Sequence, residues 1–380
     1  MMMESHREYT IGLRNRGLRE YTFLLCRSYA LTLFPNAWFA LQALGVAHKL
    51  TSIDFPIQKA YVTNVANGAT KEVSYMGING TSNGPIAVHR SALLETLAGE
   101  LAPGTIRFSS KLTSIRTITI DDEVSSSIAI LSLDDGTIIK AKVLIGCDGV
   151  HSLVARWLGL MAPEEIYQFI DEGKRAGFVP LTDKELYWFL TYNSSLKVVA
   201  KGFNGDLAKD FPSVLLEVVQ HADLATVTWA QLMFRYPWDL IFSQGCKGNI
   251  TVVGDAMHPM TPDLGQGGCL ALENAVILGR HVAKSLLLNP NSHEWLVAVD
   301  AAKAIEGYVK ERRWRAVGLI TRSYFSSLVQ QGGSGSFMNF LRDTIFYGFL
   351  FHRFFNVQYD YGKLPNVTLF SEFDVQTKID

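Results

Sequence analysis

The chain has few cysteines and no excess of charge of either sign. Its 380 residues include four cysteines, none of which forms a C-x-x-C pair: Cys26, Cys147, Cys246 and Cys269. This wide spacing argues against a zinc site and against a disulfide framework, so we expect no metal. The 35 basic and 36 acidic residues give a formal net charge of −1. A near-neutral chain without a basic stripe gives no indication of nucleic-acid binding.

The sequence also lacks an uninterrupted apolar run of the roughly 20 residues that a membrane-spanning helix needs. The most apolar stretch, residues 337–355, is broken by Arg342 and Asp343. We expect it to pack as a helix on the rest of the protein, with peripheral membrane contact as the alternative. Residues 1–19 lack the apolar centre of a signal peptide, which predicts a cytoplasmic protein. The chloroplast is the alternative if a transit peptide precedes this sequence.

What the chain does contain is typical of a globular enzyme. Hydrophobic residues make up 48% and charged residues 19% of the sequence, a balance that excludes a disordered protein. A chain of this length can bury a substantial core.

The most informative segment joins a short apolar strand to a turn rich in glycine and proline. Residues 249–253 are mostly β-branched and lie between two glycines, which predicts a buried strand. Asp255 would then project from its carboxyl end, where ligands bind in open α/β sheets and where a carboxylate can accept hydrogen bonds from hydroxyl groups. Pro262 stiffens the turn that follows, and Gly265 and Gly267 let the backbone approach a flat ligand.

A helix is predicted to follow this turn at residues 269–281, because apolar residues recur there at helical spacing. Its N-terminus would offer free N–H groups and the positive end of a helix dipole to a ligand beside the turn. Taken alone, an Asp before such a turn is as readily a helix cap or a turn former.

Two upstream segments have related features. Residues 142–145 are predicted to form a strand that ends at Gly146 and leads through Asp148 and Gly149 into a helix, although a lone Asp-Gly pair is usually only a turn. Arg90 stands at the start of an amphipathic helix, from which its guanidinium can reach a phosphate group. The alternative for Arg90 is an ordinary solvated helix residue.

Together, these motifs resemble the flavoprotein aromatic hydroxylase family, the FAD-dependent monooxygenases that include salicylate and para-hydroxybenzoate hydroxylases and zeaxanthin epoxidase. The pattern at 254–273 reproduces the family's Gly-Asp-Ala, His, Pro and Gly-Gln-Gly signature, and the Asp-Gly pair and Arg90 match two further family motifs. The plant members related to salicylate hydroxylase are most similar, over most of residues 30–364.

The resemblance implies an FAD site and identifies its residues by motif. Asp255 is expected to bind the ribitol, Gly265 to Gly267 the pyrimidine edge of the flavin, and Asp148 and Arg90 the pyrophosphate side. No catalytic side chain is identified, and we expect His258 to be a turn residue packed near the flavin rather than an acid or base. The expected cofactor-binding residues are Arg90, Asp148, Gly149, Gly254, Asp255, Pro262, Gly265, Gln266 and Gly267.

The implied fold is mixed α/β: a Rossmann-like FAD-binding domain, an antiparallel-sheet substrate domain and C-terminal helices. We expect the FAD-binding domain to be discontinuous, at residues 1–55, 88–160 and 245–325. The substrate domain would take residues 56–87 and 161–244, and the C-terminal helical segment residues 326–380. The implied reaction uses NAD(P)H and O2 to hydroxylate or epoxidise an apolar or aromatic small molecule.

The chain departs from the family pattern at two places. Residues 1–29 contain no Gly-x-Gly-x-x-Gly loop, which predicts an incomplete site for the adenosine half of FAD. After Leu160, where the family continues through an Arg-containing strand, part of the substrate-domain sheet is expected to be missing. The alternative function is therefore a truncated, non-catalytic family member, a splice form or relic with weak or no flavin binding that acts, if at all, as an interaction protein.

Overall fold

The computed structural model describes the chain from residue 30 onward, with gaps. The described residues are 30–50, 56–65, 68–75, 84–119, 127–160, 174–181, 185–192, 211–222, 233–288, 294–331, 340–350 and 359. Residues 1–29, in which the glycine-rich loop is missing, lie outside this part.

The described part alternates short strands with helices. The strands are β1 (Ala30–Leu33), β2 (Lys59–Thr63), β3 (Thr70–Ser74), β4 (Ile86–His89), β5 (Leu112–Thr119), β6 (Ser127–Leu133), β7 (Ile138–Ala141), β8 (Leu144–Gly146), β9 (Lys174–Pro180), β10 (Leu186–Tyr192), β11 (Cys246–Lys247) and β12 (Ile250–Val252). The α-helices are α1 (Pro35–Ala43), α2 (Arg90–Gly99), α3 (Leu153–Trp157), α4 (Ser213–Gln220), α5 (Pro237–Phe242), α6 (Gly267–Leu288) and α7 (Glu294–Gln331). Short 3-10 turns η1 (Ala47–Lys49), η6 (Gly254–Ala256) and η7 (Pro262–Leu264) and a π-helical segment η8 (Leu341–Leu350) complete the set.

A parallel strand pair places the two Asp-containing motifs side by side. Strand β12 pairs in parallel with β8, with Val252 opposite Gly146, and β11 adds an antiparallel edge. All three residues of β12 are buried, as its β-branched composition predicts. Because parallel strands end at the same edge of a sheet, the turns that carry Asp148 and Asp255 leave the sheet together.

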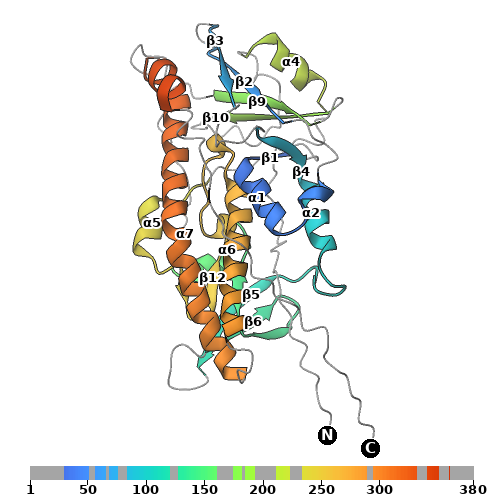
Figure 1. The fold of residues 1–380 in the computed structure, drawn as a ribbon, viewed down its shortest axis with the longest axis vertical. Coiled ribbons are helices and arrows are strands. Elements are labelled where there is room, and N and C mark those ends of the chain that lie inside the picture. Colours follow the sequence, from blue (N-terminus) through green and yellow to red (C-terminus); the bar gives the residue numbers. More distant parts are fainter. Residues whose placement is uncertain are drawn as a thin grey trace, which may run out of the picture.

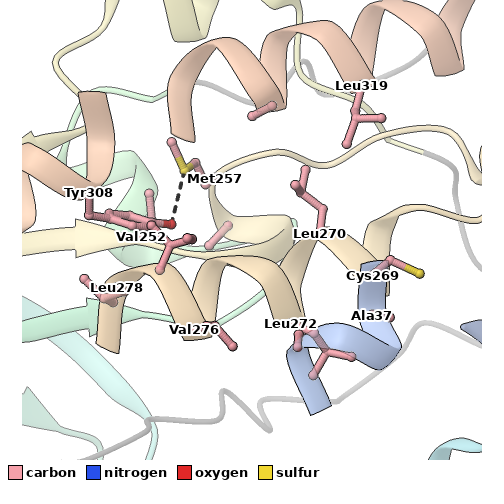
Figure 2. Close-up of a cluster of buried hydrophobic side chains, with 14 of the residues drawn as sticks. Ala37, Val252, Met257, Cys269, Leu270, Leu272, Val276, Leu278, Tyr308 and Leu319 are labelled. Carbon is pink, nitrogen blue, oxygen red and sulfur yellow. Dashed lines mark hydrogen bonds between the residues drawn. The ribbon is translucent and has the colours of Figure 1, made fainter. Parts of the chain in front are cut away.

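Two long helices support this sheet and run along the molecule (Figure 1). Figure 2 shows side chains of α6, α7, β12 and α1 meeting in one apolar cluster, in which the Tyr308 hydroxyl donates to Met257 Sδ at 3.6 Å. Leu270 and Ile277 of α6 and Ile305 and Ile320 of α7 are fully buried there. The expected helix is confirmed, although it begins at Gly267 rather than Cys269 and runs on to Leu288.

The remaining strands pair antiparallel, as expected for the mixed α/β class. The β9–β10 hairpin lies with β2, β3 and α4 at one end of the molecule, and β5 and β6 lie at the other (Figure 1). One face of the hairpin packs under α4, where Leu215 and Val219 contact Trp188. The opposite face carries Arg175, Gly177 and Phe189.

The hairpin follows the place at which part of the substrate-domain sheet was expected to be missing. Strand β9 contains an arginine, Arg175, which reaches the turn before α6. Residues 161–173 lie outside the described part, so the expected loss after Leu160 stays a prediction.

The C-terminal apolar stretch is helical where it is described. Segment η8 contacts α7, and Phe346 is only 2% exposed and joins the main core. Core packing is the role we expected of this stretch. Within the described residues, no helix combines the length and the apolarity that crossing a bilayer takes.

Packing at Gly146 leads to a stability prediction. A Cβ at this position would lie 2.6 Å from Val154 Cβ and 2.9 Å from Val252 Cγ1, so Gly146→Ala should force β8, α3 and β12 apart. Overpacking of this kind costs about 1–3 kcal/mol of unfolding free energy, to be measured by urea denaturation. Gly279→Ala is the control, because a Cβ there meets nothing within 4 Å and alanine favours the helix. A Gly146→Ala protein as stable as wild type would contradict the tight packing.

Candidate functional site

Asp255 lies at the end of β12, beside the first turn of α6. Gly254 opens the turn η6 with a φ of +60°, a conformation that favours glycine. A Cβ placed on Gly267 would meet only Asp255 Oδ1, at 3.8 Å, so the backbone at the start of α6 is open to a flat ligand. Asp255 itself is exposed to solvent. The structure therefore brings a carboxylate and an accessible helix N-terminus together.

Arg90, the first residue of α2, acts electrostatically on the same carboxylate. The surrounding protein atoms raise the pKa of Asp255, and the Arg90 guanidinium opposes this shift. Strand β4, which pairs antiparallel with β1, leads directly into α2. The predicted helix start at Arg90 is confirmed, and Arg90 is exposed on it.

The turn before α6 has a shape that depends on glycine. Pro262 starts η7, and Gly265 ends it in the left-handed region with a φ of +62°. A Cβ at Gly265 would lie 3.0 Å from the ring of Phe34, so a side chain would be crowded as well as strained. The Leu270 N–H donates to the Gln266 carbonyl at 2.8 Å, which starts the hydrogen bonding of α6.

The side chain of Gln266 points into the protein. It is 1% exposed, and its Oε1 accepts a hydrogen bond of 3.0 Å from Asn36 Nδ2. Asn36, a fully buried residue of α1, also donates to Glu273 Oε1 at 2.6 Å. The turn thus presents its backbone outward and uses its one long polar side chain as an internal anchor.

Behind this anchor lies a buried charge cluster on α6 and α7. The Glu273 carboxylate is fully buried and is bound by Arg312, also fully buried, and by Arg315 at 2.8 Å. Arg312 Nε donates to Asn274 Oδ1 at 2.8 Å. Sequence reasoning missed this cluster. The available signal was the combination of an acid on the apolar side of the predicted α6 with two arginines one turn apart on α7.

His258 is enclosed and neutral. Burial, reinforced by the nearby positive charge of Arg312, lowers the pKa of His258 to about 3. Its Nε2 lies 2.7 Å from Asn274 Nδ2, so the neutral ring accepts from the amide. Among the described residues, no carboxylate hydrogen-bonds this solvent-shielded imidazole, which fits the expected turn residue rather than an acid or base.

Asp148 has a local role in the structure. Its Oδ1 accepts from the Ser152 hydroxyl, and its Oδ2 accepts from the backbone N–H of Leu153 at 2.7 Å and of Val154 at 3.4 Å. Asp148 thus satisfies N–H groups at the start of α3, and Gly149 turns the chain before it with a φ of +79°. A role of Asp148 at the pyrophosphate stays a prediction.

Arg175 of β9 joins the hairpin to the same turn, a contact that sequence reasoning also missed. Its Nη1 lies 2.7 Å from Asp263 Oδ1, and the Asp263 side chain is 1% exposed. The guanidinium also lies 5.5 Å from the centre of the Phe189 ring. Burial raises the pKa of Tyr187, and the charge of Arg175 opposes this shift. An aromatic sheet face is therefore held against the turn that leads into α6.

Comparison with known proteins gives relatives over nearly the whole chain. No protein-family model matches the sequence. Monooxygenase 2 of Arabidopsis thaliana is 35% identical over 374 residues, 90% of this chain and 90% of that protein. Monooxygenase 1 of the same plant is 30% identical over 333 residues, 79% and 80% of the two chains. The structure of Klebsiella pneumoniae HpxO complexed with FAD and uric acid superposes with a TM-score of 0.64 at 19% identity, covering 91% of this chain and 85% of that chain.

Removing the buried Glu273 carboxylate should lower the unfolding free energy far more than removing the exposed Glu306 carboxylate. Glu273→Gln should lower the unfolding free energy by about 3–5 kcal/mol, because it leaves the buried Arg312 charge without its partner. Glu306→Gln on α7 is the matched control, since the exposed Glu306–Lys310 pair is worth at most about 1 kcal/mol. Urea denaturation of both variants checks this. Equal losses would mean that Glu273 does not hold α6 against α7.

Because His258 is neutral in the folded protein, the unfolding free energy should fall as the solution is acidified. The folded-state pKa of about 3 lies below the ordinary value of 6.5, so the unfolded chain binds the proton more readily. The His258 contribution is complete above pH 6.5 and is lost progressively down to pH 3, by up to about 1.4 kcal/mol per pH unit. His258→Gln should flatten the pH dependence of the unfolding free energy in this window. An unchanged slope would contradict a neutral, enclosed His258.

Proposed function

Because the chain belongs to the FAD-dependent monooxygenases of the flavoprotein aromatic hydroxylase family, we propose that it uses NAD(P)H and O2 to hydroxylate or epoxidise an apolar or aromatic small molecule. One observation carries the proposal. The open backbone at Gly267, the Asp255 carboxylate and the Arg90 guanidinium meet at the carboxyl edge of the β8–β12 pair.

These residues fit the riboflavin half of FAD. The bare Gly267 backbone leaves space for a planar ring, and the free N–H groups of the first turn of α6 can stabilise negative charge at the ring edge. Asp255 is an exposed acceptor for the ribitol hydroxyls. For the adenosine half, the described residues contain no Gly-x-Gly-x-x-Gly loop, so we assign no residue to it.

FAD, when bound and reduced, supplies the electrons that activate O2 for transfer of one oxygen atom to the substrate. The protein's part is to bind, orient and keep water away. Gly265 and Pro262 fix the turn, and Leu264, at 1% exposure, closes it on the core side. We infer that NAD(P)H is the electron donor from family membership, and no side chain is assigned to its binding.

The substrate side of the proposal rests on the β9–β10 hairpin. The sheet face that bears Arg175 also carries Val179, Tyr187 and Phe189, and the Arg175–Asp263 ion pair joins it to the turn before α6. Aromatic and aliphatic side chains favour an apolar or aromatic substrate. HpxO, whose structure holds uric acid, binds a planar ring compound, which agrees with this class.

The purified protein should bind FAD and, with a suitable substrate, oxidise NADH or NADPH. Asp255→Ala should weaken FAD binding at least about tenfold, because a hydrogen bond to a charged group contributes about 1.5–3 kcal/mol. Flavin fluorescence titration measures the dissociation constant. Glu95→Gln, a change at an exposed carboxylate of α2, is the control and should bind FAD as wild type does.

Two outcomes would count against the proposal. A wild-type protein that stays colourless with added FAD would contradict the cofactor assignment and favour the truncated, non-catalytic alternative. Equal FAD affinity of Asp255→Ala and wild type would contradict the ribitol role while leaving the cofactor in place.

A further inference from the structure

Tyr359 lies on the buried charge cluster although it is distant from it in sequence. Its ring centre is 4.6 Å from the Arg312 guanidinium carbon and 5.3 Å from that of Arg315. Its hydroxyl donates to Glu311 Oε1 at 2.9 Å. One aromatic side chain from the C-terminal region therefore contacts both arginines that bind Glu273.

The ring face meets two arginine charges. Arg312 and Arg315 both bind the Glu273 carboxylate at a place that little water reaches. The face of an aromatic ring attracts a cation, and the attraction grows when the cation is removed from water. The Tyr359 ring thus adds an attraction for both arginines beside that of the Glu273 carboxylate.

Glu311 binds the hydroxyl group of Tyr359. It accepts from Arg280 through both oxygens and from His281 Nε2 at 2.8 Å, in addition to Tyr359. Partial burial opposes its ionisation, but these hydrogen bonds lower the pKa of Glu311 to about 2. Glu311 is therefore a charged, well-bonded acceptor for the Tyr359 hydroxyl.

A continuous chain of contacts joins this cluster to the turn before α6. Arg315 binds Glu273, Glu273 accepts from Asn36, and Asn36 holds the side chain of Gln266. The backbone of Gln266 in turn accepts the first hydrogen bond of α6. Movement of the two arginines would therefore be passed on to the turn through the buried hydrogen bonds of Asn36.

We propose that Tyr359 is a positioning residue for the flavin-binding turn: its ring holds Arg312 and Arg315 on Glu273, and the bonds through Asn36 then fix Gln266 and the start of α6. The link to flavin rests on the proposed function. The link to the turn does not, because it is a property of the protein without ligand.

Hydrogen exchange and FAD binding of full-length variants test the proposal. Tyr359→Leu removes the ring face, whereas Tyr359→Phe keeps it and loses only the bond to Glu311. Tyr359→Leu should raise amide exchange at least threefold in a peptide spanning residues 262–270 and weaken FAD binding at least fivefold. Tyr359→Phe should stay within twofold of wild type in both measurements.

Asn36→Ala tests the connecting step. It should reproduce the exchange increase in residues 262–270, and the double variant with Tyr359→Leu should change little further, because two breaks in one chain of contacts are not additive. Trp314→Leu, which removes a 65% exposed ring from α7, the helix of Arg312 and Arg315, is the matched control and should resemble wild type.

Several results would overturn the proposal. The first is unchanged amide exchange of residues 262–270 in Tyr359→Leu, and the second is an equal effect of Tyr359→Phe and Tyr359→Leu. The third is full additivity of the exchange increases of Tyr359→Leu and Asn36→Ala in the double variant. The fourth is a rise in exchange in residues 112–133 as large as that in residues 262–270, which would indicate general destabilisation. If wild type binds no FAD, the proposed function fails, and the exchange measurements still decide the role of Tyr359.

Discussion

A single buried carboxylate, that of Glu273, determines how the principal helices pack. Removing an ion from water is costly unless charged and hydrogen-bonding partners replace the solvent. Here the partners come from α7 and α1: Arg312 and Arg315 bind the carboxylate, and Asn36 donates to it. Only one relative placement of the three helices satisfies all these bonds. The apolar contacts around them favour close packing, but apolar contacts alone permit sliding, whereas the charge cluster fixes the register.

The same constraint explains why the turn before α6 presents backbone rather than side chains. Gln266 is held inward by Asn36, Asp263 is held by Arg175, and the remaining positions that face outward include Gly265 and Gly267. The turn is thus anchored from two directions, by the helices behind it and by the β9–β10 hairpin beside it. A ligand at this turn would meet N–H groups whose positions are set before binding, which lowers the ordering cost of association.

Local features of the fold were predictable, and contacts between distant segments were not. The strand at 250–252 and the helix at 90–99 follow from β-branched and apolar periodicity within a few residues. The start of α6 at Gly267 could not be predicted, because glycine has a low helix propensity and only the surrounding contacts overcome that preference. The Arg175–Asp263 pair and the Glu273 cluster join residues far apart in sequence, and helical periodicity does not reveal which charged residue will be buried. The family motifs identified the candidate site because they record such distant contacts indirectly.

Asp148 and Asp255 occupy similar motifs in the sequence but have different surroundings in the structure. Both residues follow neighbouring parallel strands, and both look equally available for a ligand in the sequence. In the structure, α3 begins at Leu153, close enough for Asp148 to reach its first N–H groups, and both carboxylate oxygens are engaged there. Asp255 lies within the short turn η6, and η7 follows before α6 begins at Gly267, so no α-helix starts close enough along the chain for Asp255 to cap it as Asp148 caps α3. The distance from the acid to the next helix therefore decides whether it caps that helix or stays available to a ligand, and this distance favours Asp255 over Asp148 as a residue of the proposed flavin site.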